Sequence, residues 1–171
     1  IGEPGVDVRS IESFTVPENG TNYYVNDGST VGDQYTTAIG SNRNDGKTPD
    51  APKPNPVNVL RTYTLGAGSE MFVDTGNYPL IDAMHVSGST DYGLGLDQGF
   101  TITGPTNPAD VALLTTAIPE NRNEILLDLD NANFVTAEYL SFSGAERGVY
   151  AHDGSANVNL DHLTVSDMSL E

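Results

Sequence analysis

The sequence predicts an all-β fold: a right-handed parallel β-helix (solenoid) with a short N-terminal capping helix and an N-terminal strand extension. Three observations lead to this prediction. Short apolar segments separated by Gly, Asn and Asp recur from Met71 onward. Only one segment, residues 56–63, has a pattern that suits a helix. Apolar positions in the last third of the chain recur at a spacing of 23 residues, which is typical of stacked repeats.

The 23-residue repeat relates two successive segments of the chain. Residues 126–131 align with residues 149–154, and the apolar positions that follow keep the same offset: Val135 with Val158, Leu140 with Leu163, and Phe142 with Val165. Ile102 and Ile125 are also 23 residues apart. Leucine-rich repeats have a similar length, but their fixed Leu and Asn spacing is missing here. A β-sandwich is the alternative fold, and it predicts alternation without a repeat that stays in register.

The chain divides into two parts. Residues 1–22 alternate loosely between apolar and polar side chains, which indicates a strand extension closed by a turn. Residues 23–171 form the β-helix domain, with a cap over 23–66 and coils over 67–171.

Within the cap, three elements follow one another. Residues 23–25 form a short strand, and a long polar loop runs from Asn26 to Pro56. The helix over 56–63 has proline at its first position, where the missing N–H is tolerated.

The composition is strongly acidic. Asp and Glu number 24 against 7 Lys and Arg, a formal net charge of −17. This charge repels nucleic-acid phosphates and anionic membranes, so neither is expected as a partner, whereas it attracts cations. Solubility of a secreted, repetitive protein is the simpler explanation of the excess acid. The chain contains no cysteine, which excludes disulfides and thiolate sites, and no apolar run long enough for membrane insertion.

Several motifs resemble those of a known family. Tyr23-Tyr24-Val25-Asn26-Asp27, followed by residues 40–49 with their Asn-Asp-Gly sequence, resembles the opening of secreted bacterial pectate-lyase-like β-helix proteins. Residues 65–78 are similar to the family's first coil, and residues 100–105 to its second. The resemblance implies a parallel β-helix and an extracellular or cell-surface location in a bacterium. It implies no single activity, since the family includes lyases, epimerases, hydrolases and non-catalytic modules of adhesin-like proteins.

The catalytic signatures of such enzymes are missing from the sequence. Proton removal next to a uronic-acid carboxylate requires Ca²⁺ or Arg to neutralise that carboxylate, and a base of matched pKa. Only two basic residues, Arg122 and Arg147, fall in the coil region. The Asp-Pro-His-Glu signature of the epimerases and the Gly-His-Gly segment of the pectin hydrolases are absent. A lyase or epimerase acting on acidic polysaccharide is therefore the alternative, and no residue is assigned a catalytic role.

Oxygen-rich positions predict two candidate calcium sites. The 23-residue offset stacks Asp130 on Asp153, and carboxylates about 4.8 Å apart repel each other unless a cation or water lies between them. The second set lies in the long loop and consists of Asp27, Asp33, Asn44 and Asp45. For both sets the structural alternative is a series of Asx turns.

Histidines and tyrosines supply two further hypotheses. His152 and His162 lie beside aspartates and are candidates for a metal or general-base role, the alternative being outer-face turn residues. Exposed tyrosines that stack on sugar rings would suit a carbohydrate-binding adhesin module; the candidates are Tyr35, Tyr63, Tyr78, Tyr92 and Tyr139.

The expected function is that of a non-catalytic, extracellular structural module. Residues 158–165 form a full coil near the end of the sequence, and a last coil without a cap exposes backbone groups and apolar side chains. We therefore expect self-association, end to end or by donation of a strand from residues 1–22, into a filament or a larger surface protein. Further domains of a longer chain, or a polysaccharide, are the other partners considered.

Overall fold

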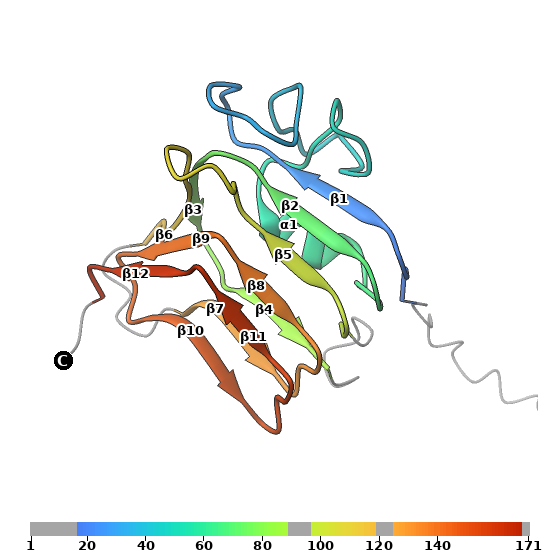
Figure 1. Cartoon of the computed structure of the whole chain (residues 1–171), viewed down its shortest axis with the longest axis vertical. Helices are drawn as coiled ribbons and strands as arrows, with labels where there is room; N and C mark the ends of the chain where they lie inside the picture. Colours follow the sequence, from blue (N-terminus) through green and yellow to red (C-terminus); the bar gives the residue numbers. More distant parts are fainter. Residues whose placement is uncertain (1–16, 89–96, 119–124, 169–171) are drawn as a thin grey trace, which may run out of the picture.

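The computed structural model describes residues 17–88, 97–118 and 125–168. Most of the predicted extension 1–22 lies outside these residues. In the described residues the chain forms twelve strands and one helix (Figure 1). Their bounds are β1 Asn22–Val25, α1 Pro56–Thr62, β2 Glu70–Val73, β3 Gly76–Leu80, β4 Met84–Ser87, β5 Thr101–Thr103, β6 Ala112–Thr116, β7 Ile125–Asp130, β8 Thr136–Glu138, β9 Leu140–Ser143, β10 Arg147–His152, β11 Asn159–Asp161 and β12 Thr164–Ser166.

All the described strands belong to three parallel sheets. The first sheet has the order β1-β2-β5-β8-β11, the second β3-β6-β9-β12 and the third β4-β7-β10. From β2 onward the chain visits the first, second and third sheets in turn and then repeats this cycle. Each strand therefore pairs, in parallel, with the strand one cycle away. The all-β prediction is confirmed: the protein is mostly β, with parallel sheets and one described helix.

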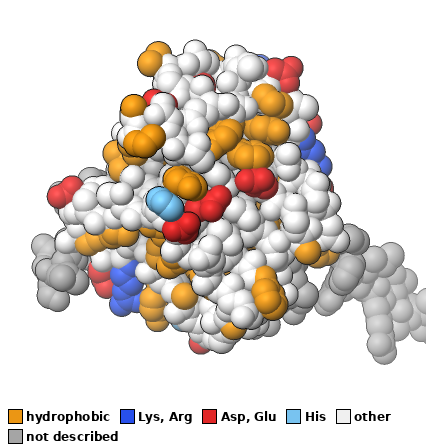
Figure 2. Space-filling model, viewed as in Figure 1, with side chains coloured by type: hydrophobic (Ala, Val, Ile, Leu, Met, Phe, Trp, Pro, Cys, Tyr) orange, Lys and Arg blue, Asp and Glu red, His pale blue; other side chains and the backbone are white. Residues whose placement is uncertain are grey.

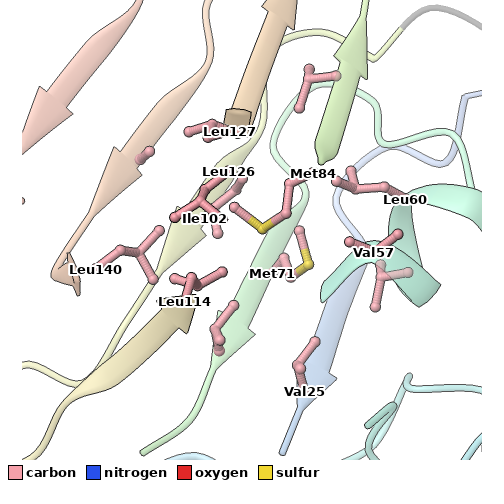
Figure 3. Packing of buried hydrophobic residues seen from close by; sticks show 14 of the residues in the cluster. Val25, Val57, Leu60, Met71, Met84, Ile102, Leu114, Leu126, Leu127 and Leu140 are labelled. Carbon is pink, nitrogen blue, oxygen red and sulfur yellow. The ribbon is translucent and has the colours of Figure 1, made fainter. Parts of the chain in front are cut away.

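The sheets share one core, built from residues that alternate along the strands. Met71 and Val73 of β2 are fully buried, because successive side chains of a strand point to opposite faces. The register places Ile102 between Met71 and Ala137 of the neighbouring strands. Figure 3 shows Met71, Ile102 and Leu114 turned toward the same interior. Burying apolar side chains of this size contributes about 1.5–3 kcal/mol each, so this stack is the main source of stability.

Helix α1 packs against the core at the end of the stack where β1 lies. The side chain of Asn55 accepts a hydrogen bond from the backbone N–H of Val57 at 2.9 Å, which caps the helix, and Pro56 occupies the first turn. The helix contacts β4 and β1, and its buried residues are Pro56, Val57, Val59 and Leu60. The predicted helix is confirmed, and it ends at Thr62, one residue before its predicted end.

The long loop between β1 and α1 is organised by a buried aspartate. Asp74 follows β2 and is fully buried. Its carboxylate accepts hydrogen bonds from the backbone N–H groups of Gln34, Tyr35 and Thr36 at distances from 2.7 to 2.9 Å. Further along the same loop, Lys53 forms a parallel bridge with Val25. The loop therefore covers the outer edge of β1.

The 23-residue offset holds for two of the three strand pairs in the last cycle and fails for the third. Strands β8 and β11 keep this offset, as do β9 and β12, in which Phe142 pairs with Val165. Strands β7 and β10 are offset by 22, so that Asp130 pairs with His152. The predicted pairing of Asp130 with Asp153 is therefore wrong by one residue. The turn after β10 is one residue longer than the turn after β7, and Asp153 and Gly154, with φ of 48° and 93°, accommodate the difference.

The same offset does not extend to earlier cycles. Ile102 lies in β5, in the first sheet, whereas Ile125 lies in β7, in the third. The predicted correspondence between them is therefore wrong. Met84 pairs with Leu127, an offset of 43 residues, because longer connections separate the strands of the earlier cycles.

Candidate functional site

The outer face of the third sheet carries a cluster of histidines and aspartates. In β7, the buried Leu127 and Leu129 alternate with Asp128 and Asp130, so the two aspartates lie on the opposite face from the core. The pairing register arranges this face in two rows: His85, Asp128 and Tyr150, and then Ser87, Asp130 and His152.

Asp128 connects two histidines from the strands on either side of it. Its Oδ2 lies 2.8 Å from Nδ1 of His85, and its Oδ1 lies 2.9 Å from Nε2 of His152. A carboxylate only accepts hydrogen bonds, so each of these ring nitrogens donates. Asp128 therefore determines which nitrogen of each ring carries a proton. The side chain of Asp128 is 16% exposed, so these contacts are only partly hydrated.

The second ring nitrogen of His152 faces another carboxylate. Nδ1 of His152 lies 2.7 Å from Oδ2 of Asp153. This hydrogen bond makes the largest contribution to the pKa of His152 and raises it above the ordinary value. Burial opposes the rise in pKa, and the hydrogen bond to Asp128 adds to it. The imidazole therefore lies between two carboxylates that favour its charged form.

Asp130 brings a third carboxylate close to His152. One ligand atom each of Asp130, His152 and Asp153 lies within 4.8 Å of the other two. Asp153 is not the strand partner of Asp130, but its left-handed backbone turns the chain there and its carboxylate approaches Asp130. The two aspartates are thus close together, as predicted, but the turn at Asp153 brings them together and not the predicted strand register.

Tyr150 and Arg147 flank the cluster. The ring of Tyr150 stacks on that of His152, with centroids 4.6 Å apart, and the guanidinium of Arg147 lies 4.4 Å from the centroid of the Tyr150 ring. Arg122, the other basic residue of the coil region, lies outside the described residues. A cluster of imidazoles and carboxylates of this kind can hold a cation or move a proton.

The loop residues predicted as calcium ligands have structural roles. Asp27 and Asp45 each accept a hydrogen bond from the backbone N–H two residues further along, which is the Asx turn named as the alternative. Asn44 donates to the carbonyl of Pro52. Among the described residues these acids do not gather with a third His, Asp or Glu as Asp130 does. Calcium binding by this loop stays a prediction.

Asp33, the remaining loop candidate, lies close to Asp74. Its Oδ2 accepts hydrogen bonds from Asn26 and Thr36, whereas its buried Oδ1 has no hydrogen-bond partner among the described residues. Burial, and then the negative charge of Asp74, raise the pKa of Asp33. The side chain thus joins the network that holds the loop.

Sequence reasoning named His152 but missed His85 and the bridging role of Asp128. The available signal was local: Met84-His85-Val86 places a histidine at the outward position of an alternating strand. Its partner, Asp128, is 43 residues away, and the 23-residue repeat does not connect them. His162, the other candidate, interacts with its neighbour Asp161 and stacks on Tyr139, outside this cluster.

The tyrosines considered for sugar binding are engaged within the fold. Tyr78 is fully buried and its hydroxyl donates to the carbonyl of Asp74, so the expectation that it is exposed is wrong. Its place in β3 turns it to the core. Tyr35 donates to the carbonyl of Gly104, Tyr63 packs on Tyr23, and Tyr92 lies outside the described residues.

Among the described residues no helix is long and apolar enough to cross a membrane, since α1 has only seven residues. Compared with family models, with curated proteins and with solved structures, the chain has no match in any of the three.

Proposed function

We propose that the chain forms a right-handed parallel β-helix in which each cycle through the three sheets is one coil. The support is the strand order: from β2 onward every described strand pairs with the strand one cycle away, as in a chain that winds continuously in one direction. The handedness rests on the general preference of parallel crossover connections, about 98% of which are right-handed.

Its proposed function is that of a non-catalytic structural module of an extracellular or bacterial cell-surface protein, joined to a second copy through its last coil. The observation that carries this proposal is the edge formed by β10, β11 and β12, here called the open edge. Each of these strands is the last of its sheet, so within the described residues none has a partner on its outer side. Unpaired strand edges are templates for pairing with another chain.

Apolar side chains accompany the open edge. Leu160 of β11 is 47% exposed and Val165 of β12 is 52% exposed. In Figure 1 the open edge lies at the end of the stack opposite to β1, and Figure 2, in the same view, shows exposed apolar side chains beside acidic ones. A partner that pairs with these strands also removes this apolar surface from water, which favours association.

The opposite end of the stack is covered. Helix α1 packs on β4, the loop residue Lys53 pairs with Val25 of β1, and Asp27 accepts a hydrogen bond from the backbone N–H of Asn77 in β3. Strand addition at that end is therefore blocked. A second copy would attach open edge to open edge, about a two-fold axis, and the product would be a dimer instead of the filament expected from the sequence.

Sedimentation over a wide range of protein concentration tests the proposal. We expect a monomer–dimer equilibrium that Leu160→Lys and Val165→Lys shift to monomer, because a charge on an edge strand opposes pairing. Ile81→Lys is the matched control: Ile81 is 77% exposed but lies between β3 and β4, and its replacement should leave the dimer unchanged. A monomer at every concentration, a dimer insensitive to both edge variants, or growth beyond the dimer would each contradict the proposal.

A further inference from the structure

The geometry points to a binding site for a divalent transition-metal ion of the Zn²⁺ class, formed by Asp130, His152 and Asp153. Their ligand atoms lie within 4.8 Å of one another. Ligands of a tetrahedral zinc ion lie about 2.0–2.2 Å from it, and thus about 3.3 Å apart, so binding requires only a small inward movement. Asp153, whose side chain is 76% exposed, is able to make that movement.

Asp130 supplies an observation independent of the residue types. It is 9% exposed, and among the described residues no hydrogen bond or ion pair joins its carboxylate, whose oxygens still touch solvent. A carboxylate that is largely removed from water is costly unless it is paired or coordinates a metal. The carboxylate of Asp130 lies beside the ligand atoms of His152 and Asp153. A cation at that point would satisfy it.

The orientation of His152 suits a metal ligand. Its Nε2 donates to Asp128, so the proton on that nitrogen is held away from Asp130 and Asp153. Nδ1 faces Asp153 at 2.7 Å and would become the ligand atom once it loses its proton. Histidine ligands commonly donate their other N–H to a carboxylate, which fixes the ring and makes the ligand more basic. His85 in turn holds Asp128 in place, at 2.8 Å.

The ligand set selects the class of metal. Calcium and magnesium take six or more oxygen ligands, whereas zinc and similar ions accept an imidazole with carboxylates and leave a position for water. The nitrogen ligand that His152 adds to this set therefore favours a transition metal over the Ca²⁺ predicted for Asp130 and Asp153. A variant that lacks the imidazole therefore distinguishes the two ions: a zinc site should be lost, whereas an all-oxygen calcium site should not depend on His152.

Calorimetric titration of the 171-residue chain with zinc chloride and, separately, with calcium chloride tests the inference. We expect one saturable zinc site per chain, lost in His152→Ala and in Asp153→Asn. Asparagine is chosen to replace Asp153 because it tolerates the left-handed backbone at that residue. Asp128→Asn should weaken zinc binding about 10–100-fold, as the loss of a carboxylate that orients a ligand does. Cobalt(II) gives a second readout, since its visible absorption reports the coordination geometry.

His162→Ala is the matched control. His162 also lies 2.9 Å from an aspartate, Asp161, but it belongs to no group of three ligands among the described residues. Circular dichroism establishes that each variant is folded. Zinc binding that survives His152→Ala, or that is lost in His162→Ala, would overturn the inference. Calcium binding at Asp130 and Asp153 that does not depend on His152 would also overturn it, in favour of an all-oxygen site.

Discussion

At the scale of single residues, buried carboxylates determine how stability responds to pH. Asp97 is 4% exposed, and its Oδ1 accepts a hydrogen bond from the backbone N–H of Leu65 at 2.7 Å. Burial raises the pKa of Asp97 to about 7, although hydrogen bonds from the Leu65 and Ser87 backbone lower it. The folded protein therefore holds this proton more tightly than the unfolded chain does.

Replacing Asp97 by asparagine should remove one pH-dependent contribution to stability. Between about pH 4 and pH 7 the folded state binds a proton at Asp97 that the unfolded state has lost, so the free energy of unfolding falls as pH rises through this window. The asparagine amide keeps an acceptor for the N–H of Leu65 and does not titrate. Urea unfolding should show the native chain losing roughly 2–4 kcal/mol relative to Asp97→Asn over this range. If the native chain and Asp97→Asn differ in unfolding free energy by the same amount at about pH 4 and at about pH 7, the assignment of this pH dependence to Asp97 is contradicted.

Asp74 gives a second prediction at this scale. Removing its carboxylate in Asp74→Ala leaves the backbone N–H groups of Gln34, Tyr35 and Thr36 without acceptors. Each unsatisfied buried group costs about 1–3 kcal/mol, so unfolding free energy should fall by about 3 kcal/mol or more in chemical denaturation. Asp45→Ala, which removes an exposed Asx acceptor, serves as the control and should cost far less. A similar loss in both variants would argue against this role of Asp74.

At the scale of elements, the corners between strands repeat their backbone conformation. Described residues 23 positions apart both have positive φ in four cases: Asn131 with Gly154, Phe134 with Asn157, Tyr139 with His162, and Gly144 with Asp167. Left-handed backbone favours Gly, Asn and Asp, because other side chains crowd the following carbonyl. The corners thus impose a conformation that Phe134 and Tyr139 adopt at a cost.

Phe134→Asn should therefore stabilise the protein. Phe134 is 65% exposed, so little burial is lost, and its φ is 57°. A left-handed non-glycine residue costs about 1–2 kcal/mol, part of which asparagine avoids, and we expect a gain of about 0.5–1 kcal/mol in thermal or urea unfolding. The reciprocal change Asn157→Phe, one cycle later at φ 55°, should destabilise by a similar amount. Destabilisation by Phe134→Asn would show that the ring makes contacts that outweigh the strain.

At the scale of the whole molecule, charge opposes the association that the open edge favours. The net charge of −17 makes two copies repel each other. Since salt screens this repulsion, the proposed dimer should become about tenfold tighter or more when sodium chloride rises from about 0.05 M to about 0.5 M. Sedimentation at the two salt concentrations measures the change. Weakening by salt would indicate that attraction between charges, and not the edge, joins the copies.

Much of the fold follows from local sequence. Alternating apolar residues determine which side chains of β7 and β4 enter the core, and Asn55 with Pro56 determines where α1 begins, because these effects act between neighbours along the chain. The Asx turns of the long loop have the same local origin. The 23-residue spacing was correct for β8 with β11 and β9 with β12, where the connections keep a constant length.

Only the tertiary structure decided which residues meet. One additional residue in the turn after β10 changes the register of that strand and places His152, and not Asp153, beside Asp130. Connections of unequal length bring His85 to Asp128 across 43 residues. Alternation along a strand determines on which face a side chain lies, but the partner across the sheet depends on the length and conformation of every intervening turn.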